Sequence, residues 1–387
     1  MDNSVHDAQR LKELQALPLE RKIQITQNRI QEWYMHWNGK VYISFSGGKD
    51  STVLATLARQ LYQNIPVIFC NTGLEFSSIQ KFAKDFGATQ IFPKMPFQEV
   101  VSTYGYPLIS KEVAEAIYYA RRIRNNPNVM EKEAYKRQQE LLGLRTEHNY
   151  KNCRVPVPSK RLLLEGTYSG CQDGKKSMFN KEKWLVAARD LPIMISHYCC
   201  SVMKKRPMSA YGSSTGCKPI IGTLADESRI RKQAWIRHGC NAFDSKKPSS
   251  QPMSFWTEQD VLTFIKESNI KIADVYGDIC LDYNKNLLYC SKCSRTGCTY
   301  CMFGAHMKGD TRFLQLAEIE PKKYDYCMKG CQWVDNPKYD ATAPVYDGAW
   351  KNWNPKKIWV PSKEGLGLKK VLTMFNELYP NNKIIFE

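Results

Sequence analysis

The pattern of apolar and polar positions predicts an alternation of strands and helices near the start of the chain. Residues 40–45 are a short apolar run of strand type, 66–70 read as a second, buried strand, and 89–92 as a third strand. Helical patterns follow the first two runs, at 52–58 and 78–86. Strands that alternate with helices imply a parallel sheet with right-handed crossovers. We therefore expect an α/β fold with a doubly wound, Rossmann-like parallel sheet.

Beyond this alternation, the pattern predicts three regions. Apolar residues at helical intervals predict an N-terminal helical segment over residues 1–38. An α/β domain is expected over 39–275, with a basic helical insertion at about 108–180 and a helix at 256–267 that Ser254 or Thr257 caps. Residues 276–387 are expected to form a cysteine-rich, metal-binding C-terminal region.

Hydropathy and net charge indicate where the protein is found and which kinds of partner it binds. No stretch among the 387 residues approaches the roughly 18 apolar positions needed to cross a bilayer. The N-terminus lacks the apolar core of a signal peptide. We therefore expect a soluble, cytoplasmic protein with no membrane partner. The net charge of +18 fits either a solvated basic surface or a polyanionic partner such as tRNA or DNA.

A glycine-containing run stands between the first predicted strand and the following helix. It reads Ser44-Phe45-Ser46-Gly47-Gly48-Lys49-Asp50-Ser51. Two adjacent glycines let backbone N–H groups approach an anion, and the positive end of the following helix points to the same place. The two serines after Phe45 offer hydroxyl groups, and the lysine offers a point charge. The run therefore predicts a phosphate-binding loop.

The six residues from Ser46 to Ser51 resemble the phosphate loop of the PP-loop ATP pyrophosphatases, in the adenine nucleotide α-hydrolase-like (HUP) group. They differ from a Walker loop, which needs Gly-x-x-x-x-Gly-Lys. The resemblance implies that the loop holds the phosphates of an adenine nucleotide, with Lys49 and Asp50 as candidate catalytic residues. The segment after the second strand resembles the family's Asp-Thr-Gly, with Asn71 in place of the aspartate. It implies nucleotide contacts from Thr72 and Gly73.

Four later segments resemble the phosphoadenosine and adenosine phosphosulfate reductase branch. They are Cys199-Cys200 with Lys204 and Pro207, Gly222 with Glu227-Ser228 and Arg231, Pro252 to Val261, and Gly297-Cys298-Thr299-Tyr300-Cys301. The resemblance spans about residues 30–306. It implies nucleotide contacts from Glu227, Ser228 and Arg231 and a catalytic role for Arg229, since guanidinium groups suit sulfate and phosphate oxygens. A surface ion-pair patch is the alternative, and Lys111 is a further anion-binding candidate.

The cysteines suggest a metal centre. Cys290-x-x-Cys293 and Cys298-x-x-Cys301 lie within twelve residues, which is tighter than the roughly 15-residue separation of structural zinc pairs. Iron–sulfur clusters accept such spacing. The reductase pattern would use Cys199, Cys200, Cys298 and Cys301, whereas a pattern like that of DNA phosphorothioation enzymes would draw on Cys293, Cys298 and Cys301. A 4Fe–4S cluster is expected, with zinc or inert buried thiols as alternatives.

The resemblance ends before the C-terminus. Sulfonucleotide reductases carry a nucleophilic cysteine in a Glu-Cys-Gly segment there, and this chain does not; Cys327 and Cys331 are the nearest substitutes. Three functions stay open. The first is a reductase-branch enzyme that uses ATP or a sulfonucleotide, a cluster, and a sulfur-donor or reductant protein. The second is an ATP-dependent adenylating sulfurtransferase acting on tRNA or DNA. The third is a non-catalytic nucleotide sensor.

Overall fold

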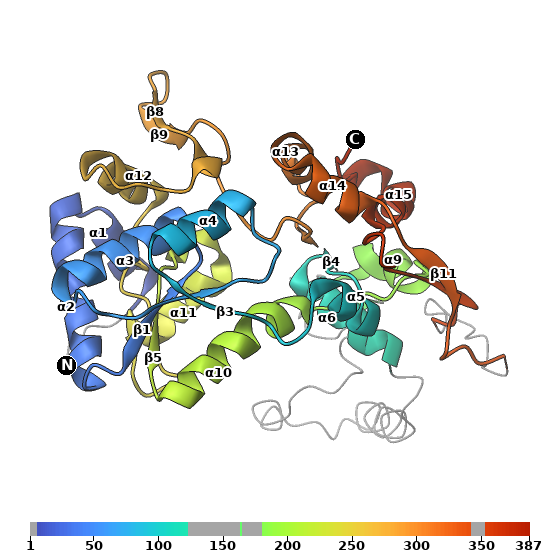
Figure 1. The fold of residues 1–387 in the computed structure, drawn as a ribbon, viewed down its shortest axis with the longest axis horizontal. Helices are drawn as coiled ribbons and strands as arrows, with labels where there is room; N and C mark the ends of the chain where they lie inside the picture. The colour runs from blue at the N-terminus through green and yellow to red at the C-terminus, as the bar shows by residue number, and fades with distance from the viewer. Residues whose placement is uncertain (1–5, 123–162, 165–179, 342–352) are drawn as a thin grey trace, which may run out of the picture. The chain divides into compact units, whose positions relative to one another are not determined.

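The computed structural model describes residues 6–122, 163–164, 180–341 and 353–387, which fall into two compact units (Figure 1). Unit 1 comprises residues 1–94 and 202–299, and unit 2 comprises 95–201 and 300–387. Most of the basic insertion predicted at 108–180 lies outside the described residues. Each unit combines two separate stretches of the chain. The domain limits inferred from the sequence stay a prediction.

Unit 1 is built on a six-stranded sheet in the order β3-β2-β1-β5-β7-β6. The strands are β1 (Val41–Phe45), β2 (Val67–Cys70), β3 (Thr89–Ile91), β5 (Lys218–Ile221), β6 (Asn241–Ala242) and β7 (Ser249–Ser250). All pairings are parallel except that of β6 with β7. The mainly parallel, Rossmann-like sheet is therefore confirmed. Because β1 pairs with β2 on one side and β5 on the other, the strand order reverses at β1, where such sheets bind ligands.

The helices of unit 1 begin and end at sequence features that explain them. They are α1 (Ala8–Gln15), α2 (Leu19–His36), α3 (Lys49–Leu61), α4 (Ser77–Asp85), α10 (Arg206–Thr215), α11 (Arg229–His238) and α12 (Glu258–Glu267), with short 3-10 helices η5 (Ala225–Glu227) and η6 (Asp274–Tyr276). Pro18 precedes α2, as expected for the break between the two N-terminal helices. Helix α3 packs on β1 and buries Val53, Leu54 and Leu57 completely. Full burial of such a side chain contributes about 1.5–3 kcal/mol.

A buried ion pair ties α2 to the start of α12. Thr257 is the N-cap of α12, which settles the choice between the two caps expected there. Its backbone and hydroxyl groups donate to Asp260 Oδ2, and the Lys22 ammonium donates to the same oxygen at 2.7 Å. Lys22 is 2% exposed, so this ammonium depends on Asp260 for its charge partner. The cluster fixes the first turn of α12, which carries Glu258.

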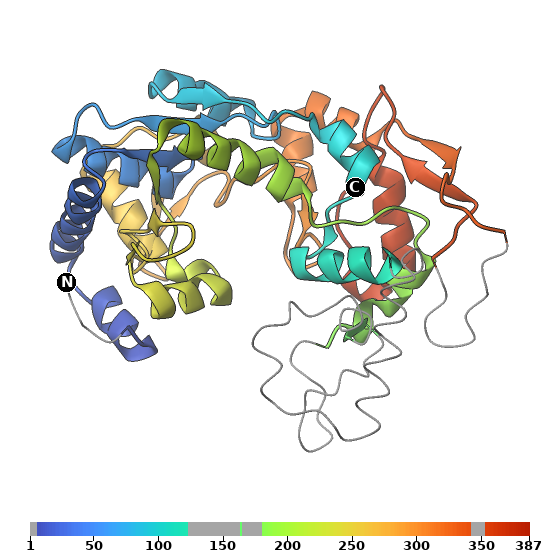
Figure 2. The same ribbon diagram turned by 90° about the horizontal axis from the view of Figure 1, so that it is seen from below.

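Unit 2 combines helices with two small sheets. Its helices are α5 (Phe97–Tyr104), α6 (Lys111–Arg122), η3 (Glu182–Trp184), α9 (Leu185–Asp190), α13 (Arg312–Ile319), α14 (Pro321–Met328), α15 (Leu368–Leu378) and η7 (Pro380–Asn382). Strands β4 (Leu108–Ile109) and β10 (Met302–Phe303) pair in parallel, and β11 (Gln332–Asp335) pairs antiparallel with β12 (Lys357–Val360). Helices α9 and α15 lie side by side in both views (Figures 1 and 2), with Trp184 against Phe375 and Tyr379. In the part of the chain that the structure describes, no helix is long and apolar enough to cross a membrane.

Candidate functional site

The predicted phosphate loop connects β1 to α3, and its conformation depends on glycine. Gly47 has φ +71°, and a Cβ atom there would lie 2.7 Å from Ile79 Cγ2 of α4. Gly48 is the N-cap of α3, so Lys49 begins the helix. The first-turn amides of a helix have no intrahelical acceptor, which makes this end of α3 a natural place for an oxyanion.

The two serines of the loop hold each other and the backbone. Ser46 Oγ and Ser51 Oγ lie 3.0 Å apart. The backbone N–H of Ser46 donates to Ser51 Oγ at 3.2 Å, and that of Gly48 donates to Ser46 Oγ at 3.3 Å. Ser51 Oγ in turn donates to the Gly48 carbonyl at 2.9 Å. These contacts preorganise the loop, and a bound oxyanion can replace the hydroxyl oxygens as the acceptor of its N–H groups.

A cavity of about 300 Å³ opens in front of this loop, within unit 1. Its walls come from the loop, from the end of β5, from α11 and α12, and from the segment after the cysteine-bearing hairpin. The lining residues are Ser44, Ser46, Gly48, Lys49, Asp50, Ser51, Ile221, Gly222, Thr223, Leu224, Glu227, Arg231, Glu258, Tyr276, Ser294, Arg295 and Thr296. The volume lies at the small end of the range of ligand pockets, roughly 300–1,000 Å³.

The charges that line the pocket balance. The lining contains three cationic side chains, Lys49, Arg231 and Arg295, and three carboxylates, Asp50, Glu227 and Glu258. Lys49 Nζ lies 3.0 Å from Glu258 Oε1, and Arg231 pairs with Glu227. Burial raises the pKa of the Asp50 carboxyl; Lys49 opposes this rise and Glu258 adds to it. The pocket therefore holds cations suited to phosphate oxygens, most of them already engaged by carboxylates.

The structure brings together most of the loop and arginine residues predicted from the sequence. Ser44, Ser46, Gly48, Lys49, Asp50, Ser51, Glu227 and Arg231 all line the pocket. Gly47 shapes the loop from behind. Ser228 caps α11 by accepting from the Arg231 N–H at 3.3 Å, and Arg229 is exposed outside the lining. Lys111 begins α6 in unit 2.

The sequence interpretation missed one wall of the pocket. Tyr276 and the stretch 294–296 line it, and Ser294 accepts a hydrogen bond from Lys49 Nζ at 2.9 Å. The hydroxyl groups of Tyr276 and Thr296 lie 2.6 Å apart, and Tyr276 lies under the Lys49 ammonium. Ile221, Gly222, Thr223, Leu224 and Glu258 also line the pocket, although the sequence assigned no ligand contact to them. The only signal in the sequence was a Ser-Arg-Thr run between the two cysteine pairs.

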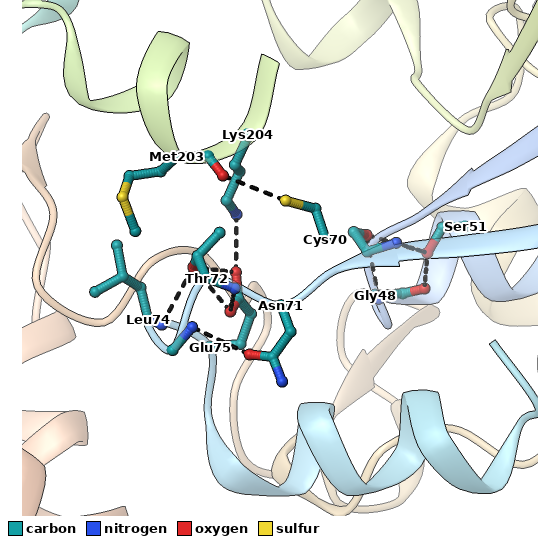
Figure 3. A network of polar contacts seen from close by, with 11 residues as sticks. Gly48, Ser51, Cys70, Asn71, Thr72, Leu74, Glu75, Met203 and Lys204 are labelled. Carbon is teal, nitrogen blue, oxygen red and sulfur yellow. Dashed lines mark hydrogen bonds and ion pairs between the residues drawn. The ribbon is translucent and has the colours of Figure 1, made fainter. Parts of the chain in front are cut away.

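Thr72 belongs to a separate polar network at the end of β2 (Figure 3). The neighbouring Gly73 donates its N–H to Asn71 Oδ1 at 3.1 Å. Thr72 Oγ1 donates to Glu75, 2.8 Å from Oε1 and 2.9 Å from Oε2, and Lys204 Nζ pairs with Glu75 Oε1 at 3.2 Å. Burial lowers the pKa of Lys204, but its interactions with Cys298 and Glu75 raise the pKa by more. The pKa of Lys204 is therefore above its ordinary value. Neither Thr72 nor Gly73 lines the pocket, and their predicted nucleotide contacts stay a prediction.

The candidate metal ligands are divided between the units. Cys293 and Cys298 belong to unit 1, and Cys199, Cys200 and Cys301 belong to unit 2. Cys290 ends the hairpin of β8 (Ile279–Asp282) and β9 (Leu287–Cys290). Burial raises the pKa of its thiol, and Lys49 opposes this rise. Among the residues that the structure describes, no group of three or more His, Cys, Asp or Glu side chains forms a metal site. The iron–sulfur prediction is therefore not confirmed.

The two cysteines considered as substitute nucleophiles lie in unit 2. Cys327 is fully buried, and burial raises the pKa of its thiol well above the ordinary value. Cys331 Sγ lies 3.4 Å from Tyr106 Oη, and its pKa is also raised by burial, although the Tyr106 hydroxyl opposes the rise. The thiolate is the nucleophilic form of cysteine, so both environments disfavour nucleophilic attack.

The sheet and the loop fit a nucleotide-binding protein of the PP-loop superfamily. The family model of the phosphoadenosine phosphosulfate reductase domain matches residues 40–94 and 158–303, just over half of the chain. The chain belongs to that family, whose members are nucleotide-binding enzymes. Every residue that lines the pocket falls within the matched ranges.

A shorter similarity links the chain to an uncharacterised protein of Methanocaldococcus jannaschii. The two are 35% identical over 94 residues, which is 23% of each chain. The chain therefore spans about a quarter of the length of the curated relative that it matches.

Proposed function

We propose that this chain is an enzyme that binds ATP or a phosphosulfate nucleotide at the loop from Ser46 to Ser51 and uses it for sulfur chemistry. One observation carries the proposal: a pocket of about 300 Å³ lies at the carboxyl ends of β1 and β5, where the start of α3, Lys49 and Arg231 converge. Ligands of open α/β sheets bind at this position. The family adds the adenine nucleotide.

In this proposal each group has a defined task. The first-turn amides of α3 and Lys49 hold the non-bridging phosphate oxygens, and Arg231 and Arg295 hold those on the opposite wall. Fixed donors of this kind stabilise the charge that develops on a departing pyrophosphate or sulfur-containing group. Arg229 is exposed, so its proposed catalytic role requires a substrate that extends beyond the pocket.

The central experiment measures binding of inorganic pyrophosphate by calorimetry. Lys49→Ala removes a charge-assisted donor, and such a hydrogen bond contributes about 1.5–3 kcal/mol, so we expect affinity to fall about 10- to 100-fold. Lys266→Ala is the matched control, because Lys266 is an exposed lysine in the last turn of α12. Wild-type protein without measurable affinity for pyrophosphate or ATP would refute the proposal.

A second candidate is an ATP-dependent sulfurtransferase that modifies tRNA or DNA. The net charge of +18 and the raised pKa values of Cys327 and Cys331 favour it over plain sulfonucleotide reduction. An acceptor oxygen would attack the α-phosphorus of ATP and release pyrophosphate, and a sulfur nucleophile would then displace AMP. Pyrophosphate release that depends on added nucleic acid supports this candidate. Sulfite release from a sulfonucleotide with a thiol donor supports reduction.

The metal centre belongs to this proposal as well. We propose that four of the five cysteines named above, Cys199, Cys200, Cys293, Cys298 and Cys301, hold a 4Fe–4S cluster, with zinc as the alternative. No step above depends on it. Metal and sulfide analysis of protein purified without oxygen tests it directly.

A further inference from the structure

The ammonium group of Lys49 is largely occupied by acceptors of the protein. It donates to Glu258 Oε1 at 3.0 Å and to the Ser294 carbonyl at 2.9 Å. A lysine ammonium has three donors. Lys49 is 6% exposed, so water satisfies little of it. A phosphate oxygen that takes either of these two positions on the ammonium must displace the acceptor that now holds it.

Glu258 is the partner that can leave. The Ser294 carbonyl belongs to the backbone of the pocket wall. The Glu258 side chain is 46% exposed and stands at the first position of α12. It can therefore turn into solvent while the cap formed by Thr257 and Asp260 stays intact. Of the two acceptors, Glu258 is also the one that a phosphate oxygen replaces like for like, as one anion for another.

We propose that Glu258 is a specificity-determining residue of the nucleotide site, because its carboxylate holds the place on Lys49 that a ligand oxygen would take. This inference rests on the proposed function. The positive and negative charges that line the pocket balance. A single phosphate or sulfate that displaces one carboxylate therefore gains little electrostatic attraction over the carboxylate that it replaces. A ligand with two or more linked phosphates brings more charge, which Arg231 and Arg295 can also engage.

The consequence is a preference between the two nucleotide classes. A triphosphate carries more negative charge than a phosphosulfate group, which has one charge on each of its two acidic groups. The site therefore selects a polyphosphate chain such as that of ATP over a sulfonucleotide.

The experiment compares inorganic phosphate and pyrophosphate as ligands of three full-length proteins, by calorimetry in one buffer. Glu258→Gln keeps the length and an acceptor oxygen but removes the charge. Glu267→Gln, at the exposed last position of α12, removes the same charge from the far end of the same helix. Circular dichroism and thermal unfolding establish that both variants are folded.

We expect wild-type protein to bind pyrophosphate at least about tenfold more tightly than phosphate. Glu258→Gln should raise phosphate affinity about tenfold and pyrophosphate affinity by less, so that the ratio falls. Glu267→Gln should stay within about twofold of wild type for both ligands. Unchanged affinities in Glu258→Gln would overturn the inference and leave the proposed function standing. Failure of wild-type protein and Glu258→Gln alike to bind pyrophosphate would remove the proposed function itself.

Discussion

Replacement of Gly47 by alanine tests whether the shape of the loop is set by a close contact as well as by a backbone angle. Gly47 has φ +71°, and a Cβ atom there would meet Ile79 Cγ2 at 2.7 Å. Ile79 is 1% exposed and β-branched, so its side chain has little freedom to move away. Gly216, which ends α10, has the same φ of +71° but nothing within 4 Å of its Cβ position. Comparison of Gly47→Ala with Gly216→Ala therefore separates the cost of backbone strain from the cost of steric crowding.

The two costs can be assigned from these positions. An alanine in the left-handed region costs about 1–2 kcal/mol, and both variants bear this cost. Gly47→Ala adds overpacking, which costs about 1–3 kcal/mol. We expect Gly216→Ala to lose about 1–2 kcal/mol of unfolding free energy and Gly47→Ala about 2–5 kcal/mol. If the loop moves to relieve the contact, pyrophosphate affinity should fall at least about tenfold in Gly47→Ala only.

Both glycines belong to unit 1, so both variants perturb the same compact unit. Urea unfolding followed by circular dichroism gives the free-energy differences, and calorimetry gives the pyrophosphate affinities. Equal destabilisation of the two variants would show that the contact with Ile79 has no energetic effect. Full pyrophosphate affinity in Gly47→Ala would show that the loop tolerates a side chain at this point.

Two further predictions concern buried charge. Burial raises the pKa of Asp50, so its ionised form costs stability above that raised pKa, and the cost vanishes as pH falls toward the ordinary value of 3.8. Asp50→Asn should therefore raise the melting temperature at neutral pH, and the advantage should shrink on acidification; a pH-independent difference would contradict this cause. Lys22→Met leaves Asp260 without its cation and should cost about 3 kcal/mol in urea unfolding, part of which Lys22→Met/Asp260→Asn should recover. No recovery in the double variant would assign the loss to packing of the Lys22 stem.

Short-range sequence patterns predicted the strands, the glycine loop and the helix cap, because these features depend mainly on residues close together in the chain. The runs that became β1 and β2 are mostly apolar on both faces, and Gly47, Gly48 and Lys49 stand at a strand–helix junction. Both features could be recognised without the rest of the chain. Thr257 as the cap of α12 is another local feature. The strand β5 is short and only half-buried, which gives a weak pattern.

The pocket wall from Tyr276 to Thr296 could not be predicted in this way. The contact between Lys49 and Ser294 joins residues 245 positions apart, and neither residue type signals the other. In the sequence, the cysteine pairs on either side of Ser294 indicate a metal site. They give no sign that the residues between them line the nucleotide pocket. The partner of Lys49 on α12, Glu258, likewise looks like an ordinary acidic residue in a first helical turn.

The placement of Ser294, Arg295 and Thr296 means that the α/β core is not self-sufficient. A fragment that stopped after α12 would retain all six strands and the glycine loop, yet Lys49 would lose its backbone acceptor and one side of the cavity would be open to water. Grafting the loop and sheet onto another scaffold would therefore not transfer phosphate recognition. Changes in length between Cys293 and Cys298 should alter nucleotide handling even where the sheet is untouched.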